Sequence, residues 1–310
     1  MRRLFFHALT LFLLGILAPS QHVLASGSAE HPPRADWPSS IVFTSVVGSS
    51  LQFEASRARF APFLNYMERE VGVKFTMRHF ESYDDVIESQ RRGETHLAAY
   101  GPAAYATARS RGVQITPFSM AVRGADDTGY FSVFLVRTDS PITTIADLKG
   151  KHLGLVDARS TSGNIVPRME LFKLGIVPEQ YFAKITYLGS HELAILGVAA
   201  GEVDVAVNAW GETTGMFYES AIRNGAVKRG DLRVLFRSLR IPNGPMAYLD
   251  SLPEELKARI RRASFAMPEK ALEALKLAFG SAISHVLPVD HSAYIPQMEL
   301  NAFVEGLSKR

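Results

Sequence analysis

The 310-residue chain contains no cysteine, which excludes disulfide bridges, thiolate catalysis, iron–sulfur clusters and zinc sites with cysteine ligands. It also has little net charge, because 34 basic and 31 acidic residues give a formal value of +3. The basic residues are scattered instead of concentrated on one face, so we expect no nucleic-acid partner. With 47% hydrophobic and 21% charged residues, the composition excludes a disordered or low-complexity chain.

The sequence also lacks the common enzyme motifs. It has no GxSxG nucleophile elbow, no phosphate-binding GxxxxGK[ST] loop and no GxGxxG after a strand. The stretch HELAI is not an HExxH zinc motif, because Ile195 stands where the second histidine belongs, and the nine histidines show no metal-ligand spacing. His191 beside Ser190 or Ser160 is the single candidate for a base and its nucleophile. We therefore expect no catalytic residues, no metal and no cofactor.

The amino terminus is typical of a secretion signal over residues 1–25. Arg2 and Arg3 precede an apolar run from Leu4 to Ala18, and small residues around Ala25 suit cleavage. The run is shorter than the roughly 20 residues that a membrane-spanning helix needs. Without cysteine there is no lipid-attachment site, so we expect a free protein in the periplasm. Residues 26–39 are polar and proline-bearing, which predicts a flexible leader.

After the leader, segments with strand and helix patterns alternate along the chain. Predicted strands include 41–47, 73–77, 95–100, 131–136, 152–156, 185–188, 203–208 and 232–236. Helical patterns lie between most of them, and the chain from Pro253 onward is largely helical in pattern. Repeated strand–helix–strand units indicate parallel sheets covered by helices, so the fold class is α/β.

The same order of elements restarts near Ile142, which suggests two α/β lobes of about 100–150 residues. We assign residues 40–132 and 246–310 to lobe I and residues 137–238 to lobe II. The chain is then expected to cross between the lobes at 133–136 and again at 239–245. Ligands of open α/β sheets bind at the carboxyl ends of strands, so the cleft between the lobes is the expected site.

The segment from Asp157 to Asn164 follows a predicted strand and precedes a predicted helix. Its three adjacent hydroxyls (Ser160, Thr161 and Ser162) and Gly163 offer O–H donors and free backbone N–H groups beside the positive end of the helix dipole. Such a group can hold a tetrahedral oxyanion without any formal positive charge. A helix cap with polar neighbours gives the same pattern.

Four other residues lie at comparable places. Tyr100 ends a predicted strand before Gly101 and a helix, and His191 stands between a strand and a helix. Tyr83 comes just before a helix, and Tyr130 just before the strand at 131–136. Each can donate a hydrogen bond at a cleft, and each also fits an ordinary structural role.

Several motifs together resemble the phosphonate- and phosphite-binding proteins of ABC importers. They are STSG at 160–163, GSHE at 189–192, GEVDVAVN at 201–208 and IPNGP at 241–245, supported by DLKGKHLGLVD at 147–157 and DSPI at 139–142. The resemblance covers roughly residues 40–300 with the motifs in order. It implies a type II periplasmic binding protein that closes on a phosphonate-like group.

By position, the resemblance implies that Ser160, Thr161 and Ser162 bind that group with His191 opposite them. It also places Tyr83 and Tyr130 at the cleft. Tyr100 and Gly163 are further candidates for ligand contact. The implied partners are a small phosphorus oxyanion and a membrane permease, with the binding protein acting as a monomer.

Two departures from the family's pattern bear on the ligand. Binders of aminoalkylphosphonates carry a Glu after the VDVA run and an Asp in the IPxDP turn, and both hold the ammonium group. Here those positions fall near Trp210 and at Gly244, although Glu212 stands close to the first. We therefore expect phosphite, a short alkylphosphonate such as methylphosphonate, or phosphate, with Trp210 closing the space of the amine arm. An aminoalkylphosphonate binder and a sensory protein that presents its ligand to a receptor kinase are the alternatives.

Overall fold

The computed structural model describes residues 34–45, 50–124, 127–212 and 215–307. The signal segment expected at 1–25 lies outside these residues, as does the leader up to residue 33. The last part of the expected leader is packed, because the Trp37 ring is buried in a core cluster beneath the guanidinium of Arg259. Residues 34–39 are therefore not a flexible linker, since burial of the indole anchors them to lobe I.

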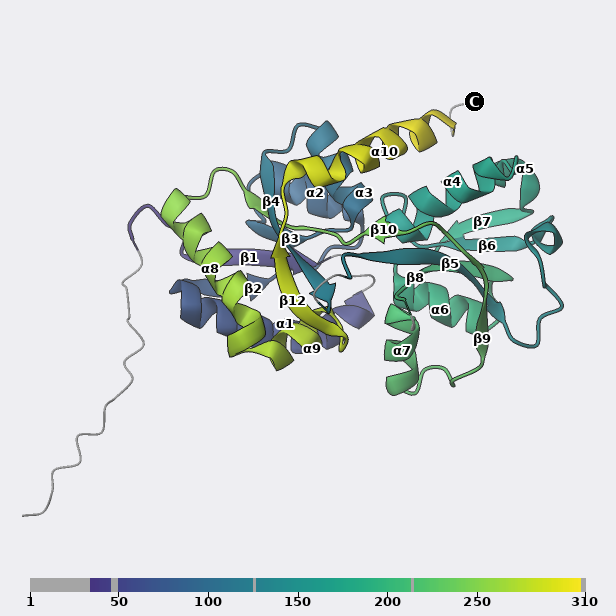
Figure 1. The fold of residues 1–310 in the computed structure, drawn as a ribbon, viewed down its shortest axis with the longest axis horizontal. Coiled ribbons are helices and arrows are strands. Elements are labelled where there is room, and N and C mark those ends of the chain that lie inside the picture. Colours follow the sequence, from purple (N-terminus) through teal and green to yellow (C-terminus); the bar gives the residue numbers. More distant parts are fainter. Residues whose placement is uncertain (1–33, 46–49, 125–126, 213–214, 308–310) are drawn as a thin grey trace, which may run out of the picture. The chain divides into compact units, whose positions relative to one another are not determined.

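Lobe I is built on a six-stranded sheet (Figure 1) with the order β12-β4-β11-β3-β1-β2. The neighbours of β1 run parallel to it, whereas β11 and β12 run antiparallel to the strands they pair with. The strands are β1 (Ser40–Ser45), β2 (Lys74–Met77), β3 (Leu97–Ala99), β4 (Ile115–Arg123), β11 (Met246–Leu249) and β12 (Ile283–Pro288). The helices are α1 (Ser50–Val71), α2 (Tyr83–Arg91), α3 (Pro102–Ser110), α8 (Glu254–Lys270), α9 (Leu272–Phe279), η3 (His291–Tyr294) and α10 (Ile295–Leu307).

Aromatic side chains join the sheet of lobe I to its helices. Phe43 on β1 lies 5.4 Å from both Phe60 and Phe63 of α1, measured between ring centroids, and Phe63 lies 5.4 Å from Phe279 of α9. Aromatic pairs at such spacings add about 0.5–1.5 kcal/mol to the gain from burial. This packing holds β1 against α1 and α1 against α9.

Lobe II is built on a second sheet with the order β10-β5-β8-β6-β7, in which β9 also pairs with β5. The strands are β5 (Gly129–Arg137), β6 (His152–Leu155), β7 (Lys184–Tyr187), β8 (Val205–Trp210), β9 (Leu232–Arg237) and β10 (Ile241–Pro242). The helices are η1 (Ile145–Leu148), η2 (Thr161–Ile165), α4 (Val166–Lys173), α5 (Pro178–Tyr181), α6 (His191–Ala199) and α7 (Met216–Arg223). The parallel strands β6, β7 and β8 carry the turns that face the cleft.

One expected crossing lies elsewhere. Residues 133–136 are in the middle of β5, paired with β8 on one side and β9 on the other, so they belong to the second sheet. Residues 129–132, assigned to lobe I, are also part of β5. The first passage between the sheets therefore lies between Arg123 and Gly129, and the return passage lies between Pro242 and Met246. A β-branched run predicts a strand, but its sequence does not show which sheet it joins.

Helix α10 belongs to lobe I and also touches lobe II (Figure 1). Asn301 of this helix donates a 2.8 Å hydrogen bond to the carbonyl oxygen of Ala103 at the start of α3. Glu305 accepts a 2.7 Å hydrogen bond from Arg159, and the Phe303 ring lies 5.2 Å from that of Phe172 on α4. The end of the chain thus ties the two lobes together beside the cleft.

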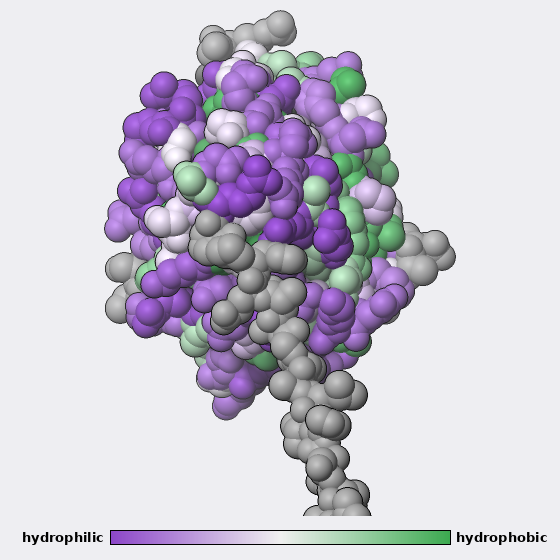
Figure 2. Space-filling view, turned by 90° about the vertical axis from the view of Figure 1, so that its left-hand side faces the viewer, coloured by the Kyte–Doolittle hydropathy of each residue, from purple (hydrophilic) through white to green (hydrophobic). Residues whose placement is uncertain are grey.

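Polar residues predominate on the face of the molecule that Figure 2 shows. This is expected where amphipathic helices turn their apolar sides toward a sheet. Among the residues that the structure describes, no helix combines the length and the hydrophobicity that a bilayer span requires.

The turn after β6 is packed too tightly for any side chain larger than hydrogen at Gly163. A Cβ atom there would overlap the Cβ atom of Val156 and the hydroxyl of Ser160. The turn is wider than an α-helical turn, because the amide of Ile165 donates to the carbonyl oxygen of Ser160 at 3.0 Å, five residues back. Wide turns of this kind are frequent at functional sites.

We predict that Gly163→Ala lowers the free energy of unfolding by about 1–3 kcal/mol, because overpacking must displace the turn from β6. Chemical denaturation followed by circular dichroism measures the change. Gly306→Ala in α10 is the matched control, since its Cβ would meet open space, and it should be neutral or slightly stabilising. Equal stability of the Gly163→Ala variant and the wild type would contradict the tight packing.

Candidate functional site

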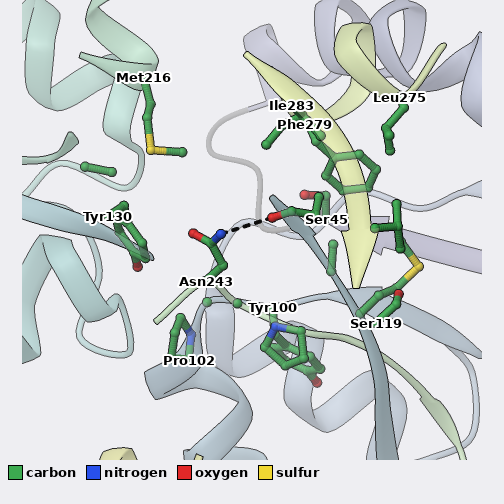
Figure 3. A pocket seen from close by; sticks show the side chains of 18 of the residues that line it. Ser45, Tyr100, Pro102, Ser119, Tyr130, Met216, Asn243, Leu275, Phe279 and Ile283 are labelled. Carbon is green, nitrogen blue, oxygen red and sulfur yellow. Dashed lines mark hydrogen bonds between the residues drawn. The ribbon is translucent and has the colours of Figure 1, made fainter. Parts of the chain in front are cut away.

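A cavity of about 230 Å³ opens between the two lobes and is lined by residues of both. Figure 3 shows it from close by, with Tyr100 and Asn243 near its middle and Tyr130 and Met216 on the side of lobe II. Its polar lining includes Tyr83, Tyr100, Tyr130, Ser162 and His191, all of which the sequence singled out. The carboxyl ends of strands in both lobes therefore meet at one site, as expected of open α/β sheets.

Strand β5 holds the turn at 160–163 against the cavity. Because side chains alternate along a strand, Tyr130 and Ser132 face the same side of β5. Ser132 donates a 2.6 Å hydrogen bond to the carbonyl oxygen of Ser162, and Tyr130 and Ser162 both line the cavity. The turn is thus held against β5 through its backbone.

Two residues of the turn at 160–163, which we call the hydroxyl turn, lie just behind the cavity wall. Ser160 accepts a 3.0 Å hydrogen bond from the amide of Gly163, which makes it the cap of the turn. Thr161 accepts a 2.8 Å hydrogen bond from the amide of Ala103, the second residue of α3 in the other lobe. Both side chains are buried, and neither is part of the cavity lining in this arrangement.

The tyrosines at the site keep their protons. Burial raises the pKa of Tyr83 above its ordinary value, and a hydrogen bond with Ser160 opposes this shift. Burial likewise raises the pKa of Tyr130, against hydrogen bonds with Ser162 and Thr161. Tyr100 is also buried with a raised pKa, and its hydroxyl donates to Gln90 at 2.6 Å. Tyr83 and Tyr130 therefore stay O–H donors at any physiological pH.

His191 begins α6 with its ring stacked on Phe217 at 4.5 Å between centroids. Burial lowers the pKa of His191 to about 4, so the free imidazole is neutral near pH 7. Its Nδ1 lies 3.2 Å from Oδ1 of Asn208. That amide cannot be turned around, because its Nδ2 donates to the carbonyl oxygen of His191 at 2.8 Å and its Oδ1 accepts from the amide of Ala209 at 2.9 Å.

The hydrogen bonds of Asn208 decide which nitrogen of His191 carries the proton. Since Oδ1 can only accept, Nδ1 of the neutral imidazole must be the donor. The remaining nitrogen, Nε2, is then an acceptor. Nε2 of His191 can therefore accept a hydrogen bond from a protonated bound group, whereas the hydroxyls of the turn can donate hydrogen bonds to it.

Direct contacts across the cleft draw the two lobes together at the site. The amide of Tyr83 donates to the carboxylate of Asp157 at 3.3 Å, and Arg159 donates to Asp84 at 3.2 Å. Gly101 approaches Thr161 so closely that a Cβ atom would lie 3.3 Å from its hydroxyl oxygen. These contacts join α2 and the residue before α3 to residues 157–161 of lobe II.

Trp210 does not line the cavity. Its ring is partly buried in the core of lobe II, stacked on Tyr218 at 6.0 Å and covered by Gly215. A Cβ atom on Gly215 would overlap the indole. The structure places this side chain in internal packing, away from the space of an amine arm.

The sequence-based predictions missed a charged side chain in the cavity wall. Arg123, the last residue of β4, lines the cavity, and among the described lining residues it is the only one charged at neutral pH. Asn243 was also missed, and it donates to the carbonyl oxygen of Ala121 at 3.1 Å, drawn as the dashed line in Figure 3. A cation at the end of a largely apolar strand could have pointed to Arg123, but the strand at 115–123 was itself not predicted.

The described lining of the cavity includes no aspartate or glutamate. Glu212 does not reach it, because both of its carboxylate oxygens pair with Arg237 and Arg240 at 3.2 and 3.3 Å. At Gly244 a Cβ atom would overlap the carbonyl oxygen of Tyr100, so this backbone admits no side chain there. The described residues also hold no cluster of three or more histidines and acids suited to a metal ion.

Comparison with known proteins places these features in a family. The family model described as the periplasmic substrate-binding protein of phosphonate ABC transporters matches residues 48–294. The phosphonates-binding periplasmic protein of Escherichia coli is 31% identical over 210 residues, which are 66% of this chain and 60% of that protein. The phosphate-import protein PhnD of Mycolicibacterium smegmatis is 28% identical over 213 residues, 66% of this chain and 65% of that protein.

The chain thus spans less than two thirds of the length of these two relatives. A solved binding-protein component of an ABC phosphonate transporter from Pseudomonas aeruginosa aligns with a TM-score of 0.75 and 26% identity, over 88% of each chain. The fold and family expected from the STSG and GSHE motifs are confirmed. The chain belongs to the family of periplasmic substrate-binding proteins of phosphonate ABC transporters, and it has their two-lobed type II fold.

Proposed function

We propose that this protein is the periplasmic binding component of an ABC importer and that it captures a phosphorus oxyanion without an amine. The observation that carries the proposal is a cavity between two lobes whose described lining offers hydroxyl donors and no carboxylate. The names of the two relatives, one for phosphonates and one for phosphate, share this chemistry. Phosphite, methylphosphonate and phosphate are the ligands in view, and the loaded monomer would then dock on a membrane permease.

Neutral donors suit this task because they cost less to bury than cations do. Tyr83, Tyr130 and Ser162 keep their protons, and the negative charge arrives with the ligand. Hydrogen bonds to an ionised group are roughly twice as strong as those between neutral partners, and exclusion of water strengthens them further. Closure of the lobes on the anion would therefore supply the binding energy, with no bond made or broken.

His191 sets the protonation state of the bound group in this proposal. An oxyanion facing an unprotonated Nε2 would bring two acceptors together, which is unfavourable unless a proton lies between them. A phosphonate can hold that proton as a monoanion, whereas a sulfonate has none at neutral pH. The arrangement of His191 and Asn208 thus favours phosphorus over sulfur oxyanions.

Removal of a hydroxyl at the site should weaken binding. We expect Ser162→Ala to raise the dissociation constant for methylphosphonate roughly five- to 150-fold, the equivalent of about 1–3 kcal/mol for a charge-assisted hydrogen bond. Isothermal titration calorimetry of the purified protein measures it. Ser110→Ala is the control, because that hydroxyl bonds carbonyl groups of its own helix α3. Unaltered affinity of the Ser162→Ala variant would remove the turn from the site.

An amine on the ligand should be harmful. We expect 2-aminoethylphosphonate to bind more weakly than methylphosphonate, by about tenfold or more, because its ammonium group would be buried without a carboxylate partner. Competition calorimetry with the two ligands gives the ratio directly. Tighter binding of the aminoalkyl ligand would overturn the choice of ligand class and leave the capture of phosphorus oxyanions intact.

We also expect binding to weaken as the pH rises. Above the second pKa of the ligand, which is about 6 for phosphate esters, both the free dianion and the free imidazole lack the proton that the complex holds. The association constant should then fall about tenfold per pH unit, with one proton taken up. Calorimetry in two buffers of different ionisation enthalpy counts that proton.

Two comparisons test the role of His191 in this dependence. His191→Gln should abolish the proton uptake, whereas His285→Gln on β12, which does not line the cavity, should preserve it. Methanesulfonate should bind the wild type at least about a hundredfold more weakly than methylphosphonate. Binding that is independent of pH, or equal affinity for the sulfonate, would refute this account of the proton.

A further inference from the structure

Arg123 is buried against the cavity with weak partners. Its side chain is 15% exposed and lies 3.8 Å from the carboxylate of Asp127, a long distance for an ion pair. Its other contact is a 3.4 Å hydrogen bond to the carbonyl oxygen of Gly129. Burial lowers the pKa of the Arg123 guanidinium, and the charge of Asp127 opposes this without offsetting it. A buried cation with partners at such distances is incompletely compensated.

The carboxylates near Arg123 already form ion pairs with other arginines. Asp127 forms a close ion pair with Arg240, whose guanidinium also pairs with Glu212. Glu212 in turn pairs with Arg237. Among the residues that the structure describes, the group therefore contains three arginines and two carboxylates, which leaves one positive charge in excess. Of these five residues, only Arg123 lines the cavity.

We propose that Arg123 binds a second acidic group of the ligand, a carboxylate on the carbon arm of a phosphonate. The inference rests on the proposed function and names the ligand class as phosphonocarboxylates. A guanidinium pairs with a carboxylate through two parallel hydrogen bonds, and one carboxylate balances the single excess charge. A second phosphoryl group, with up to two negative charges, would exceed it.

The position and size of the cavity agree with a ligand that has two acidic ends. Strand β5 connects the two binding groups, because Arg123 donates to the carbonyl oxygen of Gly129 and Ser132 donates to the carbonyl oxygen of Ser162, with Tyr130 between Gly129 and Ser132 along the strand. The cavity volume of about 230 Å³ is several times the roughly 30 Å³ that one water molecule occupies in the liquid. There is room for an arm beyond a bare tetrahedral oxyanion.

The test compares phosphonoacetate and 3-phosphonopropionate with methylphosphonate and ethylphosphonate by isothermal titration calorimetry. For the wild type, we expect at least one phosphonocarboxylate to bind about tenfold or more tightly than the alkylphosphonate of matched arm. Arg123→Met should remove most of this preference, and Arg123→Lys should retain part of it, because lysine keeps the charge and loses the paired donors.

Arg237→Met is the matched control. It removes one positive charge from the same group, at a residue that neither lines the cavity nor contacts Asp127, and it should retain the wild-type preference. Thermal unfolding checks that each variant is folded. If the wild type binds methylphosphonate without preferring a phosphonocarboxylate, or if Arg123→Met weakens both ligand types equally, this inference fails and the proposed function stands. If no phosphorus oxyanion binds, both fail.

Discussion

The structure of the site depends on how one turn is held between two strands. Gly163 allows the turn to lie directly on Val156 at the end of β6, and Ser132 of β5 holds it through the carbonyl oxygen of Ser162. Because the backbone is fixed by these contacts, the hydroxyl of Ser162 reaches the cavity without a flexible side chain. Short, stiff side chains on a fixed backbone lose little entropy when they bind.

Charge is distributed unevenly around this turn. The hydroxyl end of the cavity is neutral, with phenols whose pKa burial raises and an imidazole whose pKa burial lowers to about 4. Arg123 lines the same cavity and brings a positive charge that Asp127, at 3.8 Å, compensates only in part. A neutral end recognises a group through directed hydrogen bonds, whereas a cationic end favours any negative charge. In the proposed function, this combination would orient a ligand with two unlike ends.

The sequence was most informative where local chemistry and position coincide. A strand followed by STSG and then a helix predicts a turn of hydroxyls. Glycine or proline marks the starts of α3 and α6, and Gly93 follows the end of α2. Patterns could not show which sheet the run at 133–136 joins, because pairing partners are distant in the chain. Strands β4 and β12 escaped prediction for the same reason, since they form one antiparallel pair across long separations.

The packing of Trp210 in the core of lobe II could not be predicted from the local sequence either, because a tryptophan packs equally well in a core or at a cleft. The donor role of Nδ1 in His191 follows from its contact with Asn208, seventeen residues away, and only the three-dimensional structure shows that contact.

Gly244 has a more general consequence. There the main chain lies so close to the carbonyl oxygen of Tyr100 that no side chain fits, so this position cannot supply a carboxylate. A carboxylate partner for an amine would therefore have to come from another position, or the main chain between Pro242 and Met246 would have to follow another path.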